Sequence, residues 1–216
     1  MLIPLRLPIF IAAMCAVVAL SNYLVQFPVQ LIIGGVNLAD LWTWGAFTYP
    51  VAFLVTDLAN RTFGPSGARK IVLAGFILGI LLSIYLVTED RISPRIAIAS
   101  GSAFLLAQLL DISIFNKLRN GIWWRAPLVS SFLGSILDTV IFFSLAFAPA
   151  FLFLGANDLF AIASAPLFGI FENEVPRWIS WAIGDFAVKI LVGASMLLPY
   201  GIATKLFLKP KSALYQ

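Results

Sequence analysis

Histidine is absent from this chain, cysteine occurs once, and charged residues are scarce. The lack of histidine excludes histidine-based acid–base catalysis, a serine–histidine–aspartate triad and histidine metal ligands. The single cysteine, Cys15, cannot form an internal disulfide, and with well-separated aspartates it gives no zinc-ligand spacing. No glycine-rich phosphate loop with its lysine is present, which excludes ATP hydrolysis within this chain. These absences argue against an enzyme and predict neither a metal nor a cofactor.

The low charge content instead indicates a membrane protein. Only 11% of the 216 residues are charged and 61% are hydrophobic, whereas a soluble domain carries about 25% charged residues. The first apolar run continues past Asn22 without a cleavage site, which predicts a retained helix rather than a signal peptide. We expect one all-α membrane domain over residues 1–216. Six apolar runs are each long enough to cross a bilayer: 7–27, 45–61, 68–88, 95–117, 127–150 and 179–207.

Basic residues are distributed unevenly between the loops of this six-helix arrangement. One side holds only cations: Arg6, Arg61, Arg69, Lys70, Lys117, Arg119, Arg125, Lys205, Lys209 and Lys211. The other side holds Arg91, Arg95 and Arg177 against Asp40, Glu89, Asp90, Asp158, Glu172 and Glu174. Because cytoplasmic loops are enriched in lysine and arginine, both termini are predicted to be cytoplasmic. The net charge of +4 then requires no nucleic-acid partner.

Tryptophan supports these boundaries. All six fall at predicted water–lipid borders, as an aromatic belt requires: Trp42, Trp44, Trp123, Trp124, Trp178 and Trp181.

A few ionisable residues lie inside the apolar runs, where they are costly and become functional candidates. Helical spacing places Asp57 on one face with Arg61, and Asp185 on one face with Lys189. These four form a predicted charge network with a possible coupling role. Lys189 lies about 16 Å from Trp178, and Asp138 about 18 Å from the opposite end, so both are near the midplane. Asp138 is therefore as plausible a partner for Lys189 as Asp185, and a purely structural ion pair remains the alternative.

The run 95–117 carries a polar stripe. Phe104, Gln108, Asp111 and Phe115 follow a helical repeat that puts them on one face. Two aromatics beside an amide and a carboxylate could stack on and hydrogen-bond a flat heterocycle. The alternative is that Asp111 and Gln108 only tie helices together.

Further candidates flank the first two runs: Asn22, Tyr23, Gln26, Thr48 and Tyr49. Pro50 is expected to interrupt the second helix, which would expose backbone groups to a substrate unless neighbouring hydroxyls merely satisfy a kink. The GxxxG at Gly75 and Gly79 predicts either a homodimer face or a close internal crossing.

Several motifs together resemble the queuosine precursor transporter family, also called a vitamin uptake transporter family. They are SNYLVQFPV (21–29), TWGAF (43–47), TDLANRTFG (56–64), RIAIAS (95–100), AQLLDISIFNKLR (107–119), WWRAPLVSSFLGSILDTVIFFSLAF (123–147) and GDFAVKIL (184–191). The resemblance covers essentially the whole chain. One departure is Arg61, since many relatives carry an acidic residue there; it is therefore doubtful as a ligand, and its simpler role is to neutralise Asp57.

The resemblance implies uptake of 7-cyano-7-deazaguanine and 7-aminomethyl-7-deazaguanine across the inner membrane, for salvage into the modified tRNA nucleoside queuosine. A deazaguanine presents two adjacent N–H donors that one carboxylate can accept, and its flat ring suits an aromatic face. Asp111, Gln108 and Asp138 would then contact the substrate. The six-helix layout is similar to that of substrate-binding subunits of energy-coupling-factor transporters. Such a subunit, for another purine-like or vitamin-like solute, is the alternative function.

Overall fold

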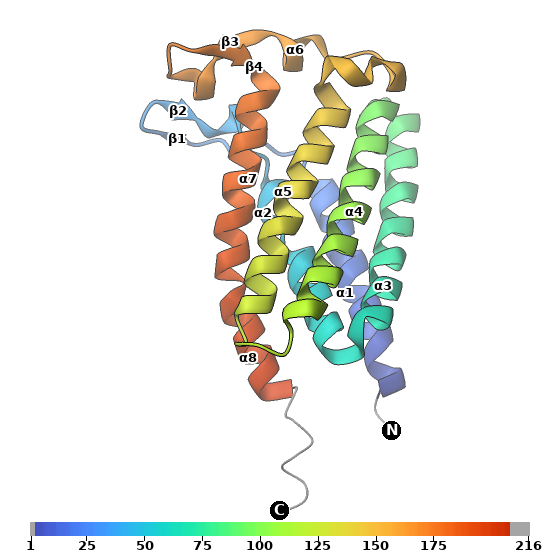
Figure 1. Cartoon of the computed structure of the whole chain (residues 1–216). Coiled ribbons are helices and arrows are strands. Elements are labelled where there is room, and N and C mark those ends of the chain that lie inside the picture. The colour runs from blue at the N-terminus through green and yellow to red at the C-terminus, as the bar shows by residue number, and fades with distance from the viewer. Residues whose placement is uncertain (1–2, 208–216) are drawn as a thin grey trace, which may run out of the picture.

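The computed structural model describes residues 3–207, and its core is a bundle of long helices (Figure 1). The strands gather at one end of the bundle. The long helices are α1 (Ile3–Leu24), α3 (Val51–Thr88), α4 (Pro94–Leu118), α5 (Arg125–Phe147) and α7 (Arg177–Ser195), joined by the shorter α2 (Trp44–Thr48) and α8 (Leu197–Phe207).

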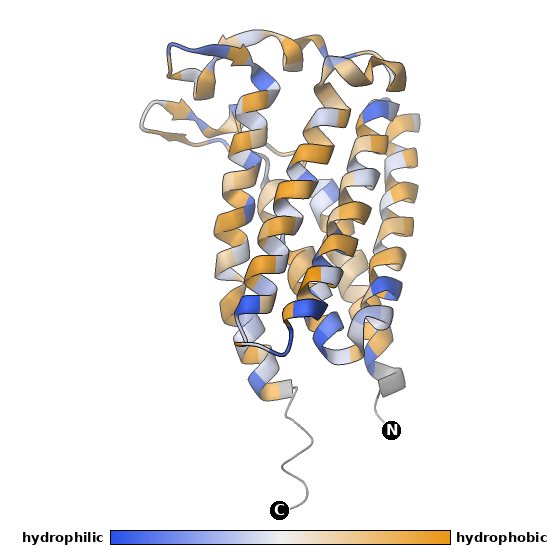
Figure 2. Cartoon of the chain, in the orientation of Figure 1, coloured by the Kyte–Doolittle hydropathy of each residue, from blue (hydrophilic) through white to orange (hydrophobic). Residues whose placement is uncertain are grey.

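Five helical stretches of the described chain are long and apolar enough to cross a membrane. They are Arg6–Leu24, Trp44–Thr88, Pro94–Leu118, Arg125–Phe147 and Arg177–Leu206. The predicted runs 45–61 and 68–88 both fall in the second stretch, which is why five stretches stand where six runs were expected. Hydrophobic residues cover the sides of the bundle, and hydrophilic ones gather toward its ends (Figure 2).

Helix α3 reverses direction at Gly64. The backbone of Gly64 has φ 75° and ψ −179°, a conformation that is essentially restricted to glycine. Before this break, Thr56 contacts Gln108 and Asn60 contacts Ile112, so this half runs parallel to α4. After the break, Gly75 lies against Phe104, and Gly101 lies against Phe76 and Ile80, so the second half runs antiparallel to α4. The two halves of α3 are therefore antiparallel to each other (Figure 1).

The GxxxG motif of α3 packs inside the subunit. A side chain at Gly75 would meet the Met14 side chain at 2.6 Å, and Gly79 faces Val18. Both contacts are with α1. This is the close internal crossing that the motif allowed.

Tyr49 and Pro50 lie between α2 and α3. The Tyr49 N–H still donates to the Gly45 carbonyl at 2.9 Å, and α3 begins at Val51. Gly45 is required by close packing, because a Cβ there would lie 2.8 Å from the Val25 backbone of α1. The turn into α3 is thus held against the end of α1.

The end of the bundle near the top of Figure 1 carries the non-helical elements. These elements are two antiparallel hairpins, the first between α1 and α2 and the second before α7. Several short helices accompany them. Their bounds are β1 (Ile32–Ile33), β2 (Val36–Asn37), η1 (Leu38–Asp40), η2 (Pro149–Leu154), α6 (Leu159–Ile162), β3 (Ser164–Pro166), η3 (Leu167–Gly169) and β4 (Glu174–Pro176).

Arg95 corrects one expectation. It was placed among the loop charges, yet only 1% of it is exposed. Its guanidinium donates to the carbonyls of Leu145 and Ala148, both at 2.7 Å, and also binds Asn157. A cation at the carboxyl end of α5 satisfies carbonyls that the helix itself leaves unpaired.

Candidate functional site

The candidate site is a cavity of about 310 Å³ between α1, α2, α4, α5 and α7. Much of its lining comes from the last turn of α1, the first half of α4, the second half of α5 and the part of α7 up to Lys189. All four regions point toward the end that carries the hairpins (Figure 1). The cavity therefore occupies that half of the bundle, away from the cation-rich end. Its polar and aromatic lining residues are Ser21, Asn22, Thr43, Tyr49, Ser100, Asp138, Phe142, Phe143, Phe147, Trp181, Asp185 and Lys189.

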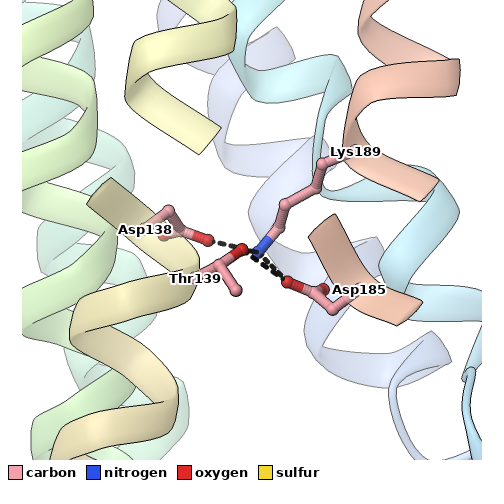
Figure 3. Close-up of polar contacts among 4 residues, drawn as sticks. All are labelled: Asp138, Thr139, Asp185 and Lys189. Atoms are coloured by element: carbon pink, nitrogen blue, oxygen red, sulfur yellow. Dashed lines mark hydrogen bonds and ion pairs between the residues drawn. The ribbon is translucent and has the colours of Figure 1, made fainter. Parts of the chain in front are cut away.

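Lys189 lies at the wall of this cavity and joins two helices. Its ammonium group donates to Asp138 of α5 at 2.6 Å and also to Asp185, one turn earlier on α7 (Figure 3). Thr139 lies 3.3 Å from the same nitrogen and donates to Asp185 at 2.9 Å. The sequence left Asp138 and Asp185 as rival partners for Lys189, and the structure brings both to it.

One oxygen of this network has no partner. Oδ2 of Asp138 accepts from Lys189, whereas Oδ1 is buried and has no hydrogen-bond partner among the described residues. A buried carboxylate oxygen without a donor is costly, so a bound ligand with an N–H group would stabilise it. Asp138 and Asp185 against Lys189 sum to one formal negative charge, which favours a ligand that donates hydrogen bonds.

Aromatic side chains form the remaining walls. Phe143 and Phe147 of α5 pack with ring centroids 6.0 Å apart, and Trp181 of α7 lies edge-on to Phe147 at 5.8 Å. On the opposite side, Tyr49 lies with its ring centroid 5.9 Å from the Lys189 nitrogen, within cation–π range. Flat apolar walls around a few polar groups are typical of small-molecule sites.

Three of the sequence-predicted ligands line this cavity: Asn22, Tyr49 and Asp138. The Asn22 amide group donates to the Val18 carbonyl of its own helix. Thr48 is adjacent but bonds Ser21 at 3.0 Å instead of lining the cavity.

Two predicted ligands near the end of α1 lie elsewhere. Tyr23 is 59% exposed and packs on Phe27, with ring centroids 5.0 Å apart. Gln26 is exposed and accepts a hydrogen bond from Arg91 at 3.0 Å. Neither residue lines the cavity.

The stripe on α4 is buried but does not reach the cavity. Phe104 packs edge-on to Tyr49, Gln108 accepts from Thr56 at 2.6 Å, and Phe115 packs on Tyr200. Asp111 is fully buried. The predicted common face exists, yet its members contact α1, α3, α5 and α8 rather than one shared pocket.

Arg61 does not neutralise Asp57. The only ion pairs among residues 6–206 are those of Lys189, and Arg61 instead donates to the carbonyl of Arg119 while lying over the Phe115 ring. The four residues of the expected charge network are therefore not all connected. Asp185 and Lys189 meet at the cavity together with Asp138, whereas Asp57 and Arg61 form no ion pair with each other.

The aromatic walls were missed by the sequence reading. Phe142 lies one helical turn after Asp138, and Trp181 one turn before Asp185, so both share a face with a predicted acid. Spacing from these acids could have found them. Trp181 was instead assigned to the lipid border, because its position near the start of α7 also fits an aromatic belt.

Comparisons with known proteins identify the family of this chain. Residues 43–203 match the model of the "Putative vitamin uptake transporter" family. The chain is 34% identical over 211 residues to the queuosine precursor transporter of Escherichia coli (strain K12), covering 89% of this chain and 84% of that protein. It is 32% identical to the "Probable queuosine precursor transporter" of Haemophilus influenzae, over the same shares. A Bacillus subtilis protein of the same description is 27% identical, covering 76% of this chain and 71% of its own length. No solved structure matches the chain. This multi-helix membrane protein belongs to the vitamin uptake transporter family.

Proposed function

We propose that this protein takes up queuosine precursors, the 7-deazaguanines 7-cyano-7-deazaguanine and 7-aminomethyl-7-deazaguanine, across the bacterial inner membrane. The observation that carries the proposal is the unpartnered, buried Oδ1 of Asp138 at the wall of an aromatic-lined cavity. Supporting it, relatives that share about a third of the sequence bear the name queuosine precursor transporter.

The cavity fits this ligand class. A volume of about 310 Å³ lies at the lower end of the range of about 300–1,000 Å³ for small-molecule sites, which suits one bicyclic ring. The N1–H and 2-amino groups of a deazaguanine are adjacent donors for the Asp138 carboxylate. Phe143 and Trp181 provide flat surfaces for the ring, and Asn22 provides an amide for its O6 atom.

The proposed topology has six crossings with both termini in the cytoplasm. The antiparallel halves of α3 each cross once, so the five stretches give six passages. The start of α1, the reversal of α3, the connection from α4 to α5, and α8 lie at one end (Figure 1). That end carries the cations Arg6, Arg61, Arg69, Lys70, Lys117, Arg119, Arg125 and Lys205. Lys209 and Lys211 belong to the same prediction but lie outside the described residues.

With the cationic end in the cytoplasm, the cavity lies in the outer half of the membrane domain. This arrangement would be the substrate-loading state of an uptake cycle. Tyr49, which lies between α2 and α3 and lines the cavity, would then lie beside the substrate. Transport would require the α2 and α7 walls to close and the cytoplasmic half to open.

Uptake into vesicles tests the function. Purified protein in lipid vesicles, without ATP or any other protein, should exchange radiolabelled 7-cyano-7-deazaguanine for unlabelled substrate, and protein-free vesicles should not. Binding of the substrate with no exchange until ATPase subunits are added would instead indicate a subunit of an energy-coupling-factor transporter. If the protein neither binds nor exchanges this compound, the proposed substrate is refuted.

A further inference from the structure

A second buried polar cluster lies between the first half of α3, α4 and α5, nearer the cation-rich end than the cavity. None of its residues lines the cavity. Ser130 lies eight residues before Asp138 on α5, which corresponds to about 12 Å along the helix. The cluster is fully buried, with exposures of 0–2%, and consists of Thr56, Asp57, Asn60, Gln108, Asp111 and Ser130.

The hydrogen bonds of this cluster leave several groups unsatisfied. Thr56 donates to Gln108 at 2.6 Å, and Asn60 donates to the carbonyl of Ile112 at 3.0 Å. Both oxygens of Asp111, Nε2 of Gln108 and Oδ1 of Asn60 have no partner within the described part of the chain. Gln108 lies one turn before Asp111 on the same face of α4. Buried polar groups without partners are unfavourable, and most of the unsatisfied atoms here are acceptors, so a hydrogen-bond donor at this place would stabilise the cluster.

Asp57 completes the cluster with a second carboxyl group. It accepts hydrogen bonds from Ser130 at 3.3 Å and Ser131 at 3.4 Å, and it lies opposite Asp111 in the register of the α3–α4 contact. The contacts of Thr56 with Gln108 and of Asn60 with Ile112 hold the two helices in register on either side of this pair.

No basic group compensates the two carboxyls. Neither forms an ion pair within the described range. Arg61 of α3 binds the Arg119 carbonyl, and Lys189 of α7 is occupied by Asp138 and Asp185. The other elements facing Asp57 contribute only neutral groups: the hydroxyls of Ser130 and Ser131 on α5, Tyr200 on α8, and Gly193 and Met196 at the end of α7.

We propose that Asp57 and Asp111 form a proton-binding site that couples substrate entry to proton entry. Two ionised carboxylates cannot be buried together without a cation, whereas a proton held between them removes one of the two charges and supplies a donor for one unpartnered oxygen of Asp111. The bound proton comes from the outer side with the substrate and is released to the cytoplasm. The inference rests on the proposed function, because it names the driving ion of that transport.

The placement of the pair fits this role. It lies between the cavity and the cytoplasmic end, within the helices that must separate for the inner side to open. An unprotonated pair would repel across the α3–α4 contact, so proton binding would favour the closed arrangement of this half. Protonation at Asp57 and Asp111 would thereby influence the cavity without any contact with the substrate.

The test uses the purified protein in vesicles clamped at zero membrane potential. An inward proton gradient should concentrate 7-cyano-7-deazaguanine about tenfold per pH unit for a one-to-one stoichiometry. An internal pH dye should report acidification when substrate enters. Asp57→Asn and Asp111→Asn should retain substrate affinity within about threefold and should still exchange substrate, but should lose concentrative uptake. The matched control Glu89→Gln neutralises an exposed acid at the end of α3 and should behave as wild type.

Several outcomes would overturn the inference. Wild-type exchange without a response to the proton gradient would overturn it and leave the proposed function intact. Accumulation driven by sodium would have the same two consequences. Full concentrative uptake by both variants would also overturn the inference. If the variants do not fold, the absence of proton entry with substrate in the wild type would still overturn the inference. Absence of wild-type exchange would instead refute the proposed function itself.

Discussion

The ammonium group of Lys189 lies 2.6 Å from the Asp138 carboxylate, with 4% of each side chain exposed, and so joins α7 to α5 in the middle of the bundle. Asp185 binds the same nitrogen from the preceding turn of α7. The pair is both a structural link and part of the cavity wall. Removing one charge therefore has consequences for folding and for binding that can be measured separately.

Lys189→Met should be the most damaging lysine substitution in the chain. It keeps the length of the side chain but leaves Asp138 and Asp185 without a cation in a buried site, which typically costs about 3–5 kcal/mol. We expect low yield and a lowered melting temperature in detergent. Lys70→Met, at an exposed position of α3, is the control and should have wild-type stability. Normal yield and uptake for Lys189→Met would show that the ion pair is dispensable.

Asp138→Asn should weaken substrate binding more than it affects folding. The amide keeps the shape but replaces an acceptor with a donor that opposes the substrate N–H groups. The expected loss is about 2–4 kcal/mol, or roughly 30- to 1000-fold in affinity. Direct binding of 7-cyano-7-deazaguanine to the purified variant measures it. Gln26→Ala is the control, because Gln26 is exposed and bonded to Arg91. The substrate affinity of this variant should equal that of the wild type. An unchanged affinity for Asp138→Asn would remove Asp138 from the site.

Arg95→Met should destabilise the outer end of the bundle. It removes the side-chain donor of the Leu145 carbonyl and one of the two donors to the Ala148 carbonyl, and a buried acceptor left unpaired costs about 1–3 kcal/mol. Thermal unfolding of the purified protein would show a lower midpoint. The exposed Arg91 offers a comparison, since Arg91→Met should stay within about 0.5 kcal/mol of wild type. Equal stability of the two variants would argue against the proposed role of Arg95.

Gly64→Ala should disturb the reversal of α3. The φ of 75° with an extended ψ costs a residue with a Cβ about 1–3 kcal/mol. A Cβ at Gly193 would meet nothing within 4 Å and its φ is not positive, so Gly193→Ala should be neutral or slightly stabilising. Thermal unfolding of both variants distinguishes backbone strain from a general effect of added volume. Equal midpoints would mean that the reversal does not depend on glycine.

Reporter fusions test the topology. A reporter inserted within 117–125 or fused after Gln216 should give a cytoplasmic signal, and one within 155–175 an external signal. Gln216 itself lies outside the described residues, so that fusion tests the charge-based prediction alone. A cytoplasmic signal from 155–175 would reverse the orientation of the cavity.

The amino-acid sequence by itself determined the class of this protein. Long apolar runs with few charges are typical of helices that cross a bilayer, where the helix satisfies its own backbone groups. Helical periodicity also places Asp185 on one face with Lys189, and Gln108 on one face with Asp111, within their own helices. The sequence motifs also indicated the family, and the comparisons with known proteins confirmed it. These properties are local, because they depend on composition or on spacing within one helix.

Only the tertiary structure decided which residues meet. The stripe on α4 was correctly placed on one face, but its neighbours depend on how α3 folds back at Gly64, and this put Asp111 beside Asp57 rather than in the cavity. Likewise, Arg95 became buried because the chain after α5 returns over the end of that helix. Lys189 bridges Asp138 and Asp185 because α5 and α7 are adjacent. Spacing within a helix cannot specify the helix on the other side of a contact, since that depends on the packing of the whole bundle.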